Sequence, residues 1–108
     1  MLKIHTLNDR IGAHRENAGH ATEVPPNSRL LFCNGQVGCK QDGTVPEDVG
    51  EQVTVAFDRI QAILAAADMG FKDVVKVSVY FTDAKHLDHF YAQRNTYFGD
   101  HNPPAVLL

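Results

Sequence analysis

Apolar and polar side chains alternate in two parts of the chain, with the period of two that is typical of strands. At the start, Leu2 and Ile4 alternate with polar neighbours, which predicts a half-buried strand over residues 2–7. Residues 71–82 alternate over a longer stretch and predict a second strand whose apolar face packs on helices. That apolar face contains Val75, Val77, Val79 and Phe81, and the polar face contains Lys76, Ser78, Tyr80 and Thr82.

Apolar positions three and four residues apart predict a long helix in the middle of the chain. The capping box Thr44-x-x-Glu47, with Pro46 near the first turn, predicts its start, and Gly70 predicts its end. The apolar stripe consists of Val49, Val53, Phe57, Ile60, Ile63, Leu64 and Ala67.

A second helix is predicted from Thr82-Asp83 to about Phe98. Pro103-Pro104 then prevents continuation of the helix and sets up an extended segment over residues 105–108. The stripe of this second helix contains Leu87, Phe90, Tyr91, Arg94 and Tyr97 or Phe98.

The first third of the chain is less regular. Residues 8–28 are rich in Gly, His, Asn and Pro and predict a loop with one short strand near residues 21–24. Arg29–Cys33 has the composition of a strand, and the glycines of Asn34–Gly38 allow a bulge or a close backbone approach to a ligand. The order strands, helix, strand, helix, strand predicts an α+β domain with both helices on one side of a sheet.

Size and composition predict one soluble domain over residues 1–108. No window approaches the roughly 18 apolar residues of a membrane span, and the N-terminus lacks the apolar stretch of a secretory signal, so we expect no membrane association and a cytoplasmic protein. Ten Lys and Arg stand against thirteen Asp and Glu, a net charge of −3, and no basic run exceeds two residues. This balance argues against nucleic acid as the main partner.

Cysteine and histidine give little indication of reactive or metal chemistry. Cys33 and Cys39 are too few for a disulfide framework or a four-cysteine zinc site, and we expect reduced, inert thiols. The pairs His86 with His89 and His14 with His20 have no third ligand at motif spacing, so we expect no metal site.

Four blocks of sequence, in order, resemble the RidA/YjgF superfamily over Leu30 to Pro104. The blocks are Cys33–Gly38, Val45–Asp48, Ala65–Gly70 and Asp73–Asp83. The resemblance implies a chorismate-mutase-like fold, which is a mixed β-sheet with two helices on one face, in a homotrimer with ligand clefts between subunits. It also implies hydrolysis of reactive enamines and imines to 2-keto acids and ammonia, without metal or organic cofactor.

Several positions depart from the pattern that the resemblance implies. An arginine after a Pro-Ala pair holds the substrate carboxylate in the family, and here Val106 follows Pro104-Ala105. A neutral branched side chain cannot make that bidentate contact. Asn34 replaces a serine, and the family's loop tyrosine has no counterpart. The glutamate that orients water would lie beyond Leu108, so we expect this domain to lack the family's last strand.

The candidate ligand-binding residues are therefore Asn34, Gly35, Gln36, Arg94, Ala105 and Val106, with no catalytic residue assigned. Backbone N–H groups of the Asn34–Gly38 segment could hold a carboxylate, or the segment could be only a bulge. Arg94 could replace the missing arginine as an anion anchor, or could be a helix arginine paired with an acid.

Three functions follow from this reading. The first is hydrolysis of small imines or enamines. The second is a non-catalytic trimer that binds small carboxylates or imines, which Val106 favours for the standard substrates. The third is the endoribonuclease activity with which the superfamily is often labelled. The net charge and the absence of a basic stripe argue against the third.

Overall fold

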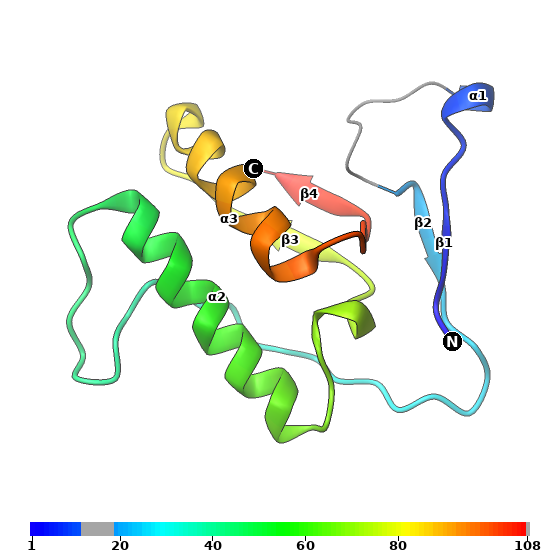
Figure 1. Cartoon of the computed structure of the whole chain (residues 1–108), viewed down its shortest axis with the longest axis horizontal. Helices are drawn as coiled ribbons and strands as arrows, with labels where there is room; N and C mark the ends of the chain where they lie inside the picture. The colour runs from blue at the N-terminus through cyan, green and yellow to red at the C-terminus, as the bar shows by residue number, and fades with distance from the viewer. Residues whose placement is uncertain (12–18, 108) are drawn as a thin grey trace.

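A computed structural model describes residues 1–11 and 19–107 (Figure 1). Three of its helical or extended elements precede the long helix, and the remainder follow it. The order is β1 (Lys3–His5), α1 (Asn8–Ile11), β2 (Ala21–Glu23), α2 (Val49–Ala66), the 3-10 turn η1 (Phe71–Asp73), β3 (Val77–Val79), the 3-10 turn η2 (Ala84–His86), α3 (Leu87–Phe98) and β4 (Ala105–Leu107).

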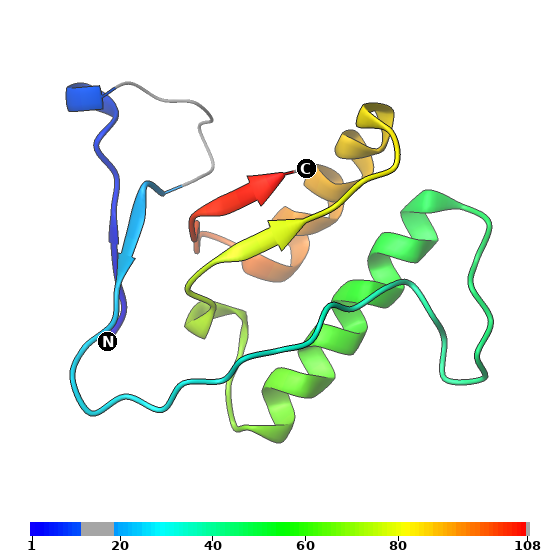
Figure 2. The ribbon, with the colours of Figure 1, turned by 180° about the vertical axis from the view of Figure 1, so that it is seen from behind.

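The described strands form two separate pairs. β1 and β2 are antiparallel with Ile4 opposite Thr22, and β3 and β4 are parallel with Ser78 opposite Val106. Figures 1 and 2 show both long helices on the same face of the β3–β4 pair. The predicted α+β class with two helices on one side is therefore confirmed.

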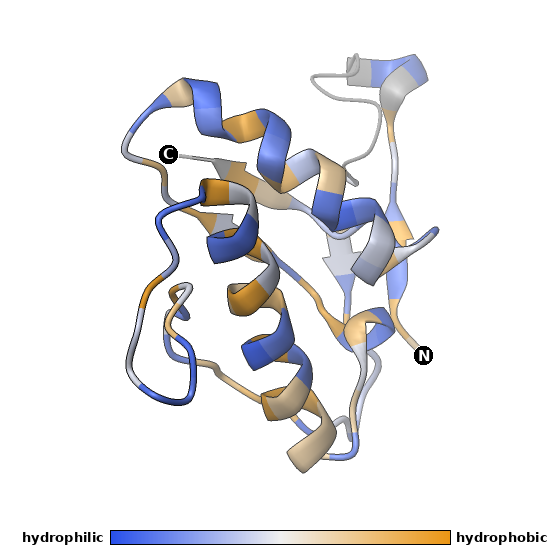
Figure 3. Cartoon of the chain, turned by 60° about the vertical axis from the view of Figure 1, so that its left-hand side comes forward, coloured by the Kyte–Doolittle hydropathy of each residue, from blue (hydrophilic) through white to orange (hydrophobic). Residues whose placement is uncertain are grey.

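The core is a cluster of aromatic rings between α2, α3 and η1. Phe57 of α2 lies at its centre, with ring centroids 4.8 Å from Tyr97 and 5.9 Å from Phe90. Apolar and polar positions succeed one another around α2, as Figure 3 shows, because only one stripe of this helix is buried. Val77 and Val79 of β3 pack against the same cluster, which confirms the predicted alternation at these positions. Val75, predicted on the same face, is instead 38% exposed.

Both predicted ends of the long helix were wrong by a few residues. Asp48, not Thr44, caps α2, because its Oδ2 accepts a hydrogen bond of 2.9 Å from the Glu51 N–H. The Thr44 hydroxyl instead donates to Asp42 at 2.7 Å within a turn. At the other end Asp68 adopts φ 59°, so the helix ends before Gly70.

The prediction of a strand at Arg29–Cys33 was wrong. No strand is assigned to these residues, and their apolar side chains are exposed, Leu30 at 63% and Phe32 at 89%. An isolated extended segment gains neither ladder hydrogen bonds nor apolar cover, and neither described strand pair offers it an assigned partner. The predicted loop also contains the short helix α1, and the strand predicted over 71–82 is reduced to β3 after η1.

Two hydrogen bonds attach the β1–β2 pair to the rest of the fold. The Gly19 N–H donates to the Asn102 carbonyl at 3.0 Å, and the Thr22 hydroxyl donates to the Val75 carbonyl at 2.8 Å. A Cβ on Gly19 would collide with the Ile4 side chain and lie 2.8 Å from the Asn102 oxygen. Glycine at this position therefore permits the close approach of the two parts.

Candidate functional site

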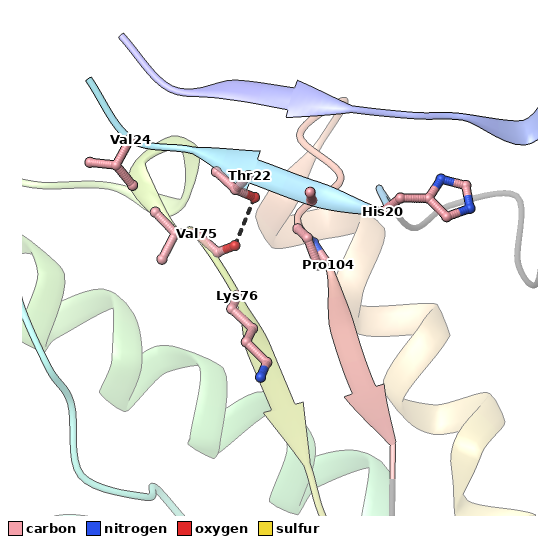
Figure 4. Close-up of a pocket in the computed structure, with 7 residues that line it drawn as sticks. His20, Thr22, Val24, Val75, Lys76 and Pro104 are labelled. Carbon is pink, nitrogen blue, oxygen red and sulfur yellow. Dashed lines mark hydrogen bonds between the residues drawn. The ribbon is translucent and has the colours of Figure 1, made fainter. Parts of the chain in front are cut away.

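An open pocket lies where β2 meets the residues that directly precede β3 and β4 (Figure 4). Its volume is about 390 Å³, which suits a small metabolite. Most of its surface is apolar. It is lined by His20, Ala21, Thr22, Val24, Val75, Lys76 and Pro104.

Thr22 and Lys76 supply side-chain polar groups to this pocket. Figure 4 shows the Thr22 hydroxyl directed at the Val75 carbonyl, with the Lys76 side chain extending along β3. The ring of His20 points away from these groups in the same view, and its Nδ1 accepts a hydrogen bond of 3.0 Å from the Leu7 N–H.

The sequence-predicted residues of β4 come directly after the pocket residue Pro104 but do not themselves line the pocket. Ala105 follows the lining residue Pro104, and Val106 lies opposite Ser78 in the parallel register. Opposite positions project to the same face of a sheet, and exposed Ser78 lies on the face away from the helices. Val106, which is 36% exposed, thus lies on the uncovered outer face.

The Asn34–Gln36 segment is attached to α2. The Gln36 Oε1 accepts a hydrogen bond of 2.9 Å from Arg59 Nε, and a second Arg59 nitrogen donates to the Cys39 carbonyl at 3.0 Å. Asn34 and Gly35 are exposed beside this attachment. None of the three lines the pocket.

Arg94 lies inside the fold rather than on the pocket surface. It is 4% exposed, with its guanidinium 5.3 Å from the centroid of the Phe98 ring. Its described hydrogen bonds are to the side-chain oxygens of Asn95 at 3.4 Å and Asn102 at 3.3 Å. Since Asn102 also accepts from Gly19, Arg94 supports the turn on which the β1–β2 pair rests.

The predicted site residues therefore lie in three separate places. Asn34, Gly35 and Gln36 lie beside α2, Arg94 lies buried on α3, and Ala105 and Val106 lie on β4. The sequence reading missed Lys76 and Thr22 as pocket residues. Lys76 was already placed on the polar face of its strand by alternation. The sequence did not show that β4 pairs with β3 in parallel, and this pairing brings Pro104 beside Lys76.

Within residues 1–11 and 19–107, no three His, Cys, Asp or Glu side chains gather as metal ligands. His14 lies outside the described residues, and both described cysteines are unbridged. None of the described helices combines the length and apolar character required to cross a membrane.

Comparison with known proteins places this fold. The family model described as Endoribonuclease L-PSP matches residues 16–108. The RutC family protein YjgH of Escherichia coli (strain K12) is 46% identical over 76 residues, covering 69% of this chain and 58% of that protein. The 2-iminobutanoate/2-iminopropanoate deaminase of the same strain is 30% identical over 74 residues, covering 68% and 58%.

A crystal structure of E. coli TdcF with bound serine matches with a TM-score of 0.64 at 26% identity, covering 69% of this chain and 62% of that one. Fold and pocket thus define a small α+β protein with two helices on one face of a parallel strand pair. The chain belongs to the Endoribonuclease L-PSP family, within the RidA/YjgF superfamily. It spans under two thirds of the length of the curated relatives described above.

Proposed function

We propose that this protein binds small 2-imino acids in the pocket beside Pro104 and hydrolyses them to 2-keto acids and ammonia. The observation that carries the proposal is the position of the pocket. Its lining includes Pro104, which directly precedes Ala105 and Val106, where the resemblance implies the substrate carboxylate. A relative is named as a 2-iminobutanoate/2-iminopropanoate deaminase.

The reaction requires little from the protein because an iminium carbon is already electrophilic. Water adds to C2 of the protonated imine and gives a carbinolamine. A proton from the added water moves to the nitrogen. The C–N bond then breaks, ammonia leaves, and the hydroxyl loses its proton as the carbonyl forms. No electrons are transferred, and the chemistry needs neither metal nor organic cofactor. The protein's contribution is to position the carboxylate and the water.

A second candidate is binding of small carboxylates or imines without turnover. Val106 favours it, since a valine on the outer face of β4 offers no donor to a carboxylate. Cleavage of RNA is not proposed, because the net charge of −3 opposes binding of a phosphate backbone.

Ammonia release from freshly generated 2-iminobutyrate tests the enzyme directly, beside a thermal-shift screen with 2-ketobutyrate. Turnover above the spontaneous rate supports the first candidate. A thermal shift without turnover supports the second. No shift and no turnover contradict both.

We also propose that the protein acts in the cytoplasm as a homotrimer with intersubunit clefts. The exposed Leu30 and Phe32 give it apolar surface to bury in an assembly. Sedimentation equilibrium tests the assembly. A trimer mass for the wild type and a lower mass for Phe32→Ser are expected, and a monomeric wild type contradicts the proposal.

A further inference from the structure

We propose that Lys76 is the anion anchor of the pocket and takes the part of the missing arginine. Its ammonium would hold the carboxylate of a small 2-imino or 2-keto acid. This inference rests on the proposed function for the identity of the ligand. The site itself is defined by the geometry of β3, β4 and β2.

The register of the parallel pair brings Lys76 to the right face. Val77 lies opposite Ala105 and its N–H donates to the Pro104 carbonyl at 3.0 Å, so Lys76 lies beside Pro104. Lys76 is exposed and two residues before Ser78, the partner of Val106. Since side chains two residues apart share a face, Lys76 and Val106 are diagonal neighbours on the outer face. The ammonium of Lys76 can therefore reach the position at which the family arginine would lie, which Val106 occupies here.

The surroundings leave this ammonium without a carboxylate partner among the described residues. Contacts within 4.0 Å between basic and acidic side chains of these residues join His5 to Glu23 and Lys85 to Asp83. Glu23, the acid of β2, is thus engaged by the neighbouring strand. Apart from His20, the other lining residues carry no ionisable side chain, so the ammonium of Lys76 is the fixed positive charge that this open pocket offers to an anion.

Thr22 adds a preference for the nitrogen end of the ligand. Its hydroxyl proton is committed to the Val75 carbonyl, so its oxygen can only accept a further hydrogen bond. A protonated imine donates hydrogen bonds and suits such an acceptor, whereas a keto oxygen does not. Lys76 and Thr22 together therefore select a small zwitterionic 2-imino acid over a neutral analogue.

The test compares Lys76→Gln with Lys72→Gln in the full chain. Lys72 is another exposed lysine, on η1, that does not line the pocket, and the two variants change the net charge equally. Binding of 2-ketobutyrate and of its uncharged amide is measured by calorimetry or NMR titration. We expect Lys76→Gln to weaken 2-ketobutyrate binding by roughly three- to tenfold and to leave amide binding unchanged. Lys76→Arg should retain the affinity, and added salt should reduce the difference.

The outcomes separate this inference from the proposed function. Equal 2-ketobutyrate affinity for Lys76→Gln and the wild type overturns the anchor, even if ammonia is released. Selective loss of carboxylate binding in Lys76→Gln supports the anchor, even if no ammonia is released. A wild type that binds no carboxylate at all overturns both.

Discussion

The phenol oxygen of Tyr97 lies 2.6 Å from Oδ1 of Asp58, and this hydrogen bond joins α3 to α2. The ring of Tyr97 also stacks on Phe57, with an interplanar angle of 12°. The hydrogen bond to Asp58, with partial burial and the negative charge of Asp58, raises the pKa of Tyr97 from 10.0 to about 12. This polar contact therefore adds to the aromatic packing that joins the two helices.

A raised tyrosine pKa means that the neutral phenol stabilises the fold. This stabilisation is fully present below pH 10.0, the unfolded value, and is lost as the pH rises through about 12. Tyr97→Phe should lower the free energy of unfolding at neutral pH by about 0.5–1.5 kcal/mol, as for one lost hydrogen bond. Urea unfolding checks this, with Tyr80→Phe on the exposed outer face as the control. Equal stabilities of the two variants would contradict it.

The hydrophobic periodicity predicted β3 and α2 because in both elements the apolar positions are the ones that pack on the core. Val77 and Val79 face the core as alternation requires, and the stripe of α2 contains the buried Phe57 and Leu64. The start of α2 could not be predicted, because Thr44 and Asp48 are both good capping residues. The turn in which Asp42 engages the Thr44 hydroxyl decides between them.

The site was less predictable than the fold because its residues are distant in sequence. Thr22, Lys76 and Pro104 meet only through the pairing of β3 with β4 and the docking of β2. Nor could composition show that Arg94 is buried on Phe98, since an arginine on a helix stripe can be core or cleft. The domain boundaries stay predictions, as do the binding roles of the six candidate residues, which are Asn34, Gly35, Gln36, Arg94, Ala105 and Val106.

Gly38 packs directly on α2 and should not tolerate a side chain. A Cβ there would lie 2.5 Å from both the Cα and the carbonyl oxygen of Gln52, and helix backbone cannot move aside. Gly38→Ala should lower the free energy of unfolding by about 1–3 kcal/mol and release the segment held by Arg59. Gly35→Ala is the matched control, because its Cβ would meet nothing within 4 Å. Hydrogen exchange and urea unfolding measure both effects, and equal behaviour of the variants would refute the close packing.

A substitution of Arg94 tests whether this side chain supports the turn at Asn102 or binds the ligand carboxylate. Its guanidinium is buried on Phe98 and bonded to Asn102, so Arg94→Met should lower the free energy of unfolding by about 1–3 kcal/mol. If Arg94 only supports the turn, the folded variant should keep its preference for 2-ketobutyrate over the amide. Calorimetry below the melting temperature measures that preference. Its loss in Arg94→Met, with retention in Lys76→Gln, would restore Arg94 as the anion anchor.

Val106→Arg tests whether the outer face of β4 can accept the charge that the family resemblance implies. Val106 is 36% exposed and its partner Ser78 is small and exposed, so a longer side chain can extend from this face without displacing the core. A guanidinium there can bind a carboxylate through two parallel hydrogen bonds, which we expect to raise the affinity for 2-ketobutyrate by about tenfold.

Val106→Lys is the control for charge alone, since an ammonium lacks the planar fork and should give a smaller gain. If Val106→Arg also increases ammonia release from 2-iminobutyrate, the pocket already positions the reacting water, and a second contact to the carboxylate, beside that of Lys76, improves turnover. A gain in affinity without any turnover indicates that the described chain binds its ligand but does not activate water, which supports binding alone. Unchanged affinity in both variants would show that the ligand does not reach β4, and would contradict the placement of the site beside Pro104.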